Sequence, residues 1–411
     1  MRRTLSMVGL FLAAALIVGI LPSRADSPIR ILENRYTVHF ADKMTFRLVA
    51  ECDQPIQSVT LYYRRQKESV TSRVIPKFTA GCHVEATFEK SLERGEIPPG
   101  TTMEYYWRLE LADGTRQDTP IQTFVYEDDR FSWQTVQADN ITVLYYGSDT
   151  DGALARAVLG HAQSVLTRLQ SEVGVSLAKP VRIYIYRNGN DMAAALSPRS
   201  EGYDERVLTL GVAVADDTLL LLGNQPSIQQ TVAHELSHIV VGLATKNPYS
   251  PIPRWLDEGL AMYAEGELPA DNAAALQDAI NRDALISVRS LSGYTGQASQ
   301  VDLYYGEVYS LVQFLLRTYG RDKMAQLLQV FQQGTYQEDA LQQVYGLSLD
   351  SLDSQWRQSL GLQPRSTVGP ARVATPQAGN SRSSGPLCPL SSLAGALGIA
   401  LAFCIRRVGA H

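Results

Sequence analysis

Hydrophobic and polar residues follow two different patterns along this chain. Between residues 36 and 126 they alternate in short runs, which is typical of half-buried β-strands. From Ile141 onward, strand-like runs are interspersed with segments of helical periodicity, and after Leu222 the pattern is mostly helical as far as Leu360. The chain is therefore predicted to be of the α+β class, with an all-β first part and a second part made of a mixed sheet and a mainly helical half.

The strands of the first part are separated by turn sequences, of which Pro-Pro-Gly at 98–100 and Asp-Gly at 113–114 are the clearest. Short strands at this spacing predict a small antiparallel sandwich of the immunoglobulin or fibronectin type, with Trp107 in its core. We place this β-sandwich domain at residues 26–128. Its sequence shows no catalytic pattern, so we expect it to act as a spacer or as a surface for binding partners.

Composition adds two exclusions. The 411 residues carry 37 Lys and Arg against 42 Asp and Glu, a formal net charge of -5, so the chain has no overall positive field to hold nucleic acid. Its 4 cysteines include no C-x-x-C pair, which excludes a thiolate zinc ribbon. Whether Cys52 and Cys82 form a disulfide stays open, because spacing alone does not fix their geometry. The oligomeric state is not indicated.

The N-terminal segment has the order of a secretory signal peptide. Arg2 and Arg3 precede an apolar run at residues 7–21, and small residues follow it. We predict a signal peptide at residues 1–25, cleaved after Ala25. A retained anchor is the alternative, since 15 apolar residues are marginal for a membrane core of about 30 Å.

The C-terminal segment predicts a membrane anchor. Residues 387–405 are almost entirely apolar and uncharged, and two arginines follow at once, so we expect a transmembrane helix there with a cytoplasmic tail at residues 406–411. A sorting tail that is later removed is the alternative. The preceding residues 362–386 are rich in Pro, Ser, Gly and Thr and predict a flexible linker.

A candidate metal site lies at residues 231–241, where His234, Glu235 and His238 follow one another in a helical segment. Residues four positions apart on a helix lie on nearly the same side, so both imidazoles can reach one ion. Imidazole nitrogens suit zinc, and a glutamate beside the first ligand can take a proton from the attacking water. We therefore expect His234 and His238 to bind Zn²⁺ and Glu235 to act as general base. A buried helix with two ordinary histidines is the alternative.

A third ligand is expected from residues 255–266. Prolines between this segment and the histidines end the first helix, so that a second helix can return beside it. Glu258 then completes a set of two histidines and one carboxylate, which leaves a fourth position for water, as in a catalytic site. Asp257 is a rival for this role, and Glu265 lies two turns further along the same face. A solvated acidic patch is the other interpretation.

The sequences HELSH at 234–238 and WLDEGLA at 255–261 together resemble those of the gluzincin metallopeptidases, and most closely the bacterial domains called peptidase MA-like. The resemblance covers about residues 133–361. It implies a gluzincin fold, zinc held by His234, His238 and Glu258, and Glu235 as the general base. In that group a strand ahead of the metal helix forms the sheet edge that aligns an extended substrate, and residues 217–223 stand in this place.

The resemblance also implies a residue that hydrogen-bonds the developing oxyanion. Residues 303–312 are similar to the family's downstream helix, in which a tyrosine occupies the place of Tyr305, so Tyr305 is expected to be catalytic. Simple packing of Tyr304, Tyr305 and Tyr309 in this helix is the competing interpretation. The chain lacks the third histidine of metzincins, because Ala244 stands there, and it lacks the Gly-x-Met-Glu-Asn stretch of related aminopeptidases.

These features predict a zinc metallopeptidase, an endopeptidase acting on peptide or protein substrates. It is expected to be a single-pass protein of the cell membrane, with its catalytic part on the extracytoplasmic side. The alternative is a catalytically inactive cell-surface binding or adhesion protein that keeps the metallopeptidase-like domain. A zinc site that hydrolyses a bond other than a peptide bond is a third possibility, and the sequence does not indicate the cleavage specificity.

Overall fold

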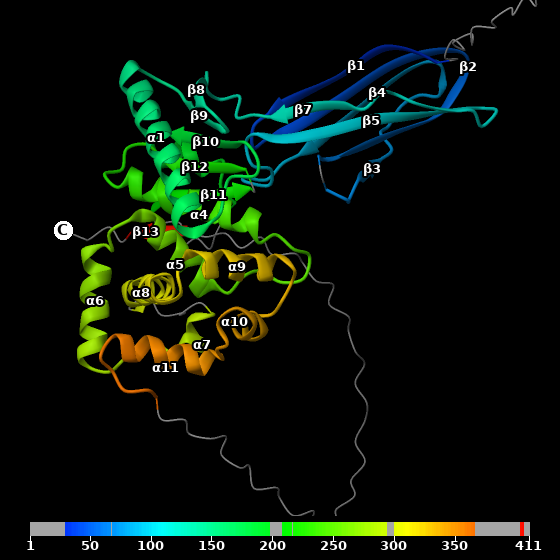
Figure 1. The fold of residues 1–411 in the computed structure, drawn as a ribbon. Coiled ribbons are helices and arrows are strands. Elements are labelled where there is room, and N and C mark those ends of the chain that lie inside the picture. The colour runs from blue at the N-terminus through cyan, green and yellow to red at the C-terminus, as the bar shows by residue number, and fades with distance from the viewer. Residues whose placement is uncertain are drawn as a thin grey trace, which may run out of the picture. The chain divides into compact units, whose positions relative to one another are not determined.

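The computed structural model describes residues 29–66, 68–197, 208–215, 217–293, 300–365 and 403–406. The chain divides into two compact units (Figure 1). Of the described residues, the first unit contains those up to Thr37 together with Thr45–Glu89 and Met103–Thr123. The second unit contains Val38–Met44, Lys90–Thr102 and the described residues from Phe124 onward. The predicted signal peptide and nearly all of the predicted linker, membrane helix and tail lie outside the described residues.

The N-terminal part is rich in β-structure. Its sheet has the order β1-β2-β5-β6, while β3 and β4 also pair with β2 and β7 pairs with β5. The pairings of β2 with β3 and β5, and of β5 with β6, are antiparallel. Alternate residues of β5 are buried, and Trp107 is fully enclosed, so its predicted place in the core is confirmed. The strands are β1 (Ile29–His39), β2 (Lys43–Arg65), β3 (Ser72–Val74), β4 (Gly81–Ser91), β5 (Thr101–Leu111), β6 (Arg116–Asp118) and β7 (Gln122–Tyr126).

Cys52 and Cys82 are both free thiols in this structure. Cys52 lies within β2 and Cys82 within β4. The Cys82 sulfur lies 3.8 Å from the carbonyl oxygen of Asp53. The disulfide that the sequence left open is therefore not formed here.

The second unit contains a mixed sheet of the order β13-β11-β12-β10-β9-β8. Its centre is parallel, because β10 pairs in parallel with both β12 and β9. The outer pairings of β8 with β9 and of β11 with β12 and β13 are antiparallel. The strands are β8 (Gln134–Ala138), β9 (Ile141–Tyr145), β10 (Val181–Tyr186), β11 (Leu208–Ala215), β12 (Thr218–Leu222) and β13 (Phe403–Arg406).

One sequence expectation about this sheet is wrong. Residues 217–223 were expected at the sheet edge, but β12 lies inside the sheet, paired with β10 on one side and β11 on the other. All residues of β12 are buried. A continuous apolar run of this kind is typical of a strand covered on both faces, as β12 is here.

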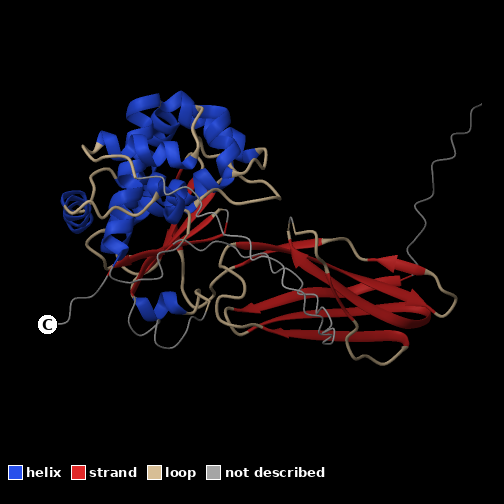
Figure 2. Cartoon of the chain, turned by 90° about the horizontal axis from the view of Figure 1, so that it is seen from below, coloured by secondary structure: helices blue, strands red, loops and turns tan. Residues whose placement is uncertain are grey.

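Helices pack against this sheet and form most of the rest of this unit (Figure 2). α1 and α4 contact the sheet and each other, α5 packs on α4, and α8 packs on α5 and α6. One hydrophobic core runs from the sheet through these helices to α11. The helices are α1 (Asp149–Arg168) with a π-helical turn at Leu169–Val173, α2 (Gly189–Ala193), α4 (Ile228–Ala244), α5 (Arg254–Glu265), α6 (Ala270–Asn281), α7 (Val288–Leu291), α8 (Val301–Tyr319), α9 (Arg321–Gln332), α10 (Gln337–Tyr345) and α11 (Leu349–Ser359).

The helices found within the described ranges include none that is both long and apolar enough to cross a membrane. The predicted span at 387–405 falls outside those ranges except for its last three residues. These residues belong to β13, where Phe403 is the partner of Val212 and Ile405 that of Thr209. A helix extending to Ile405 is thus not what the structure shows. Aromatic and β-branched residues such as these also suit a strand.

Candidate metal centre

The two histidines lie on α4, a helix that is buried along most of its length. Residues 228–241 are all enclosed except two near the start, because the helix is covered by the sheet on one side and by α5 on the other. His234 and His238 lie one turn apart, and their ring centroids are 4.8 Å from each other. The predicted pairing of the two imidazoles is therefore present in the fold.

Glu258 reaches this pair from α5. Pro253 has an extended backbone and precedes the first helical residue, as expected after a proline-rich connection. The Glu258 Oε2 atom lies 3.5 Å from His234 Nε2 and 3.9 Å from His238 Nε2. One ligand atom from each residue falls within 4.8 Å of the others. The three predicted ligands therefore converge, although Glu258 lies on a different helix from the two histidines.

Each histidine is held by a carboxylate on its other ring nitrogen. His234 Nδ1 donates to Glu265 Oε1 at 2.7 Å, and His238 Nδ1 donates to Asp257 Oδ1 at 3.0 Å. These bonds place the proton on Nδ1, so both Nε2 lone pairs point into the cluster. Asp257, which the sequence offered as a rival ligand, thus orients the His238 ring. Glu265, its neighbour along the same face, orients the His234 ring.

Two of the three candidate ligands, Glu258 and His238, have shifted pKa values. Burial alone would raise the pKa of Glu258, but its close contacts with His234 and His238 and the charge of Arg254 outweigh burial and lower it. Burial alone would lower the pKa of His238, yet the charge and hydrogen bond of Asp257 raise it. The site therefore favours an ionised Glu258, the form that binds a cation.

Glu235 lies on the same helix and is completely buried. Its Oε2 atom accepts a hydrogen bond of 3.1 Å from the backbone N–H of Ala213 in β11. The strand can come this close because Gly211 has no side chain: a Cβ there would lie 2.4 Å from Thr231 Cγ2. Burial raises the pKa of Glu235, against the opposing effect of the two histidines, which brings it closer to the range of a general base.

The tyrosines of α8 separate into different environments. The Tyr305 ring lies 6.3 Å from the His234 ring, between centroids. The buried Tyr304 hydroxyl donates to the carbonyl of Leu291 at 3.4 Å, and that of Tyr309 donates to Gly266 at 3.3 Å. Of these tyrosines, Tyr305 has its ring beside a predicted ligand, whereas the hydroxyls of the other two are engaged by backbone carbonyls.

The donor set fits a zinc ion. Two imidazole nitrogens and one carboxylate are the ligands of open, catalytic zinc sites, and the two carboxylates behind the imidazoles are the usual outer partners. His238 Nε2 and Glu258 Oε2 are buried polar atoms that make no hydrogen bond with the described residues. Such atoms are costly to leave without a partner, and a shared cation would satisfy both.

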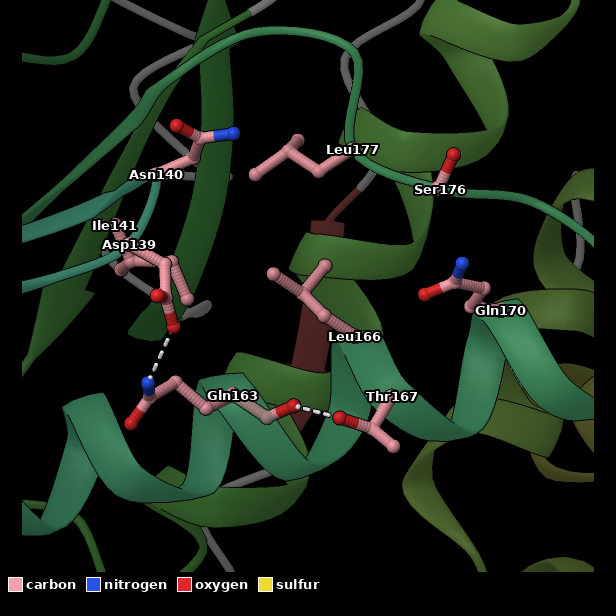
Figure 3. Close-up of a pocket in the computed structure, with 9 residues that line it drawn as sticks. All are labelled: Asp139, Asn140, Ile141, Gln163, Leu166, Thr167, Gln170, Ser176 and Leu177. Atoms are coloured by element: carbon pink, nitrogen blue, oxygen red, sulfur yellow. Dashed lines mark hydrogen bonds between the residues drawn. The ribbon is translucent and has the colours of Figure 1, made fainter.

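A separate cavity of about 290 Å³ lies between the turn that leads into β9, the C-terminal half of α1 with the π-helical turn that follows it, and residues 176–177 (Figure 3). Its charged lining residue, Asp139, accepts a hydrogen bond of 2.8 Å from Gln163. Thr167 donates to the backbone carbonyl of Gln163 at 3.0 Å. None of its lining residues belongs to the metal cluster, and we assign no chemistry to it.

Residues 161–361 match the Peptidase MA superfamily. This range contains the two histidines, Glu235 and Glu258. Residues 161–361 are thus similar to a peptidase MA-like domain. The match covers all of α4, α5 and α8, the helices that form the candidate metal centre of the peptidase MA-like domain. No curated protein matches the sequence.

Solved structures with partial similarity include an M1 zinc metallopeptidase from Deinococcus radiodurans, at 13% identity over 79% of this chain and 91% of that chain, with a TM-score of 0.37. Wild-type OgpA from Akkermansia muciniphila matches at 10% identity over 25% of this chain and 30% of that chain, with a TM-score of 0.19. This chain thus spans less than a third of the OgpA chain. The assignment of the peptidase MA-like domain rests on the family match.

Sequence reasoning did not find two contributors to the centre. Arg254, the first residue of α5, donates to Glu258 Oε1 at 2.7 Å. Ala213 contributes only its backbone N–H, which carries no sequence signal. The i,i+4 spacing of Arg254 and Glu258 is the one pattern that indicates such a contact.

Proposed function

We propose that this protein is a zinc-dependent endopeptidase. The observation that carries the proposal is the convergence of His234, His238 and Glu258 beside Glu235, which β11 holds by its backbone. A bound zinc ion would act as a Lewis acid, polarising the scissile carbonyl and making water more acidic. The stretch by which related aminopeptidases recognise a free amino terminus is missing from the sequence, which favours cleavage within chains.

The protein's own side chains supply the remaining chemistry. His234, His238 and Glu258 would hold the ion, while Asp257 and Glu265 keep both imidazoles in the ligating tautomer. Glu235 takes a proton from the attacking water and later returns it to the leaving amine. The Tyr305 hydroxyl donates a hydrogen bond to the developing oxyanion.

The decisive experiment compares wild type with Glu235→Gln. The full chain, purified in detergent, is tested for zinc content and for cleavage of a panel of unfolded proteins. We expect both proteins to hold zinc, and the variant to cleave about 100-fold or more slowly, since general base catalysis contributes that much. Glu267→Gln, at an exposed position nearby, is the matched control and should retain activity. Replacing both histidines by alanine should remove the zinc.

Two results would contradict the proposal. Wild type that holds no zinc would end the metallopeptidase proposal. If wild type holds zinc but cleaves no substrate, and so behaves like Glu235→Gln, the result would favour the alternative of an inactive binding or adhesion protein. The complete set of ligands and base argues against that alternative.

Tyr305→Phe should keep its zinc and lose about 10- to 100-fold in turnover if the tyrosine stabilises the oxyanion.

We further propose that the protein is exported and anchored by residues 387–405, the last three of which would then leave β13, with the catalytic unit outside the cytoplasmic membrane. The β-rich part, which we propose to be an immunoglobulin- or fibronectin-like sandwich, would act there as spacer or binding surface. Cell fractionation tests this: the full chain should stay in carbonate-washed membranes, and a chain ending at residue 365 should not. Equal release of both would contradict the anchor.

A further inference from the structure

Arg254 contacts one carboxylate oxygen of Glu258, and the histidine pair faces the other. The Glu258 side chain is 1% exposed, and its Oε1 accepts the 2.7 Å hydrogen bond from Arg254 Nη2. Its Oε2 is the atom that faces His234 and His238. One oxygen is therefore committed to an arginine, and the other is directed into the cluster.

The position of Arg254 is not explained by helix stability. It is the first residue of α5, where the positive end of the helix dipole disfavours a cation. An arginine one turn ahead of a glutamate is also the weaker order of an i,i+4 ion pair. A buried carboxylate, by contrast, is costly unless it is paired and hydrogen-bonded. The arginine is thus best explained by what it does to Glu258.

A second contact fixes the guanidinium. Arg254 also hydrogen-bonds the hydroxyl of Tyr304 on α8, and that hydroxyl in turn reaches the carbonyl of Leu291. The neighbouring Tyr305 packs edge-on against Tyr304, with ring centroids 5.6 Å apart. Held from α5 and α8 together, the guanidinium keeps Oε1 occupied in one geometry.

We propose that Arg254 is a positioning residue that keeps Glu258 a one-oxygen ligand and so preserves an open coordination position for water. The inference rests on the zinc site of the proposed function. A glutamate can bind a cation through one oxygen or through both. With Oε1 held by Arg254, only Oε2 is available. Without the arginine, the carboxylate is free to turn and place both oxygens on the metal, which raises the coordination number and crowds the water's position that catalysis needs.

The test compares Arg254→Met, Arg254→Lys and wild type with Co²⁺ in place of zinc. Cobalt with four ligands absorbs visible light more strongly than cobalt with five or six. We expect Arg254→Met to show the weaker spectrum of a higher coordination number and a metal affinity lower by about 10- to 100-fold, measured by chelator competition. Arg254→Lys, which can still donate to Oε1, should recover much of both. Zinc X-ray absorption should show one more oxygen neighbour in Arg254→Met.

Arg282→Met is the matched control, because Arg282 also pairs with a carboxylate four residues away, Asp278, but on an exposed helix surface. Its spectrum and affinity should equal those of wild type. If Arg254→Met binds Co²⁺ with the wild-type spectrum and affinity, the inference is wrong while the zinc site stands. If wild type binds no metal, the proposed function fails as well. Should Arg254→Met not fold, Arg254→Ala decides, since it also removes the donor to Oε1: a wild-type spectrum would overturn the inference, and an altered spectrum would support it.

Discussion

Glu307 offers a test of the electrostatics of the helical core that does not depend on the metal. It lies on α8, fully buried, and its two carboxylate oxygens accept from the backbone N–H of Ile286 at 2.9 and 3.2 Å. Burial raises the pKa of Glu307 to about 8, although the bond from Ile286 and the charge of Arg365 oppose the rise. At neutral pH the folded protein therefore holds this side chain mostly protonated.

The sign of the effect on stability follows from linkage. The pKa of Glu307 is raised above its usual 4.5, so the folded state binds a proton that the unfolded state has released. The stability from the neutral carboxyl is complete below about pH 4.5 and is lost as the pH rises to about 8. A difference of about 3.5 in pKa, at about 1.36 kcal/mol each, makes the loss about 5 kcal/mol.

The assay is urea unfolding of metal-free wild type and Glu307→Gln, followed by helix circular dichroism at several pH values between about 5 and 8. Wild type should lose stability relative to the variant by about 1.4 kcal/mol per pH unit across this range. Glu338→Gln is the control, since Glu338 also accepts a backbone N–H, from Leu349, but has a side chain 48% exposed. Parallel pH profiles for wild type and Glu307→Gln would refute the reasoning.

Two further predictions concern the packing around the metal centre. Asp257→Asn removes the carboxylate behind His238, so zinc affinity should fall about 10- to 100-fold in chelator competition, and an unchanged affinity would show that the bond does not orient the ring. Gly259→Ala should lower the free energy of unfolding by about 1 to 3 kcal/mol, because the added Cβ would lie 2.6 Å from the carbonyl oxygen of Val308; wild-type stability in thermal unfolding would show that α5 and α8 can separate without cost.

The sequence predicted those parts of the fold that depend on local periodicity. The strand-like runs expected from Ile141 onward include β10 at Val181–Tyr186, and the helical segment that carries the two histidines is α4. The convergence of His234, His238 and Glu258 was also predictable, because helix geometry fixes the first two and the prolines before α5 allow it to return beside α4.

The order of strands was not predictable in the same way. A run of five buried residues such as β12 suits either an inner strand or a buried edge, and only its two neighbours decide. The C-terminal apolar run raises the same difficulty, since Phe403–Arg406 can continue a helix in lipid or pair with β11 as it does here. Local hydrophobicity does not indicate which neighbours such residues acquire in the fold.

The roles of the residues around the ligands depend on hydrogen bonds that sequence spacing alone does not reveal. Each ligand has a second polar atom, and in each case a side chain of α5 engages it. These are Glu265 on His234 Nδ1, Asp257 on His238 Nδ1 and Arg254 on Glu258 Oε1. A single helix thus supplies one ligand and the groups that orient all three. The packing of α5 against α4 and α8 therefore sets the geometry of the centre, and a substitution that shifts α5 should weaken metal binding even where it touches no ligand.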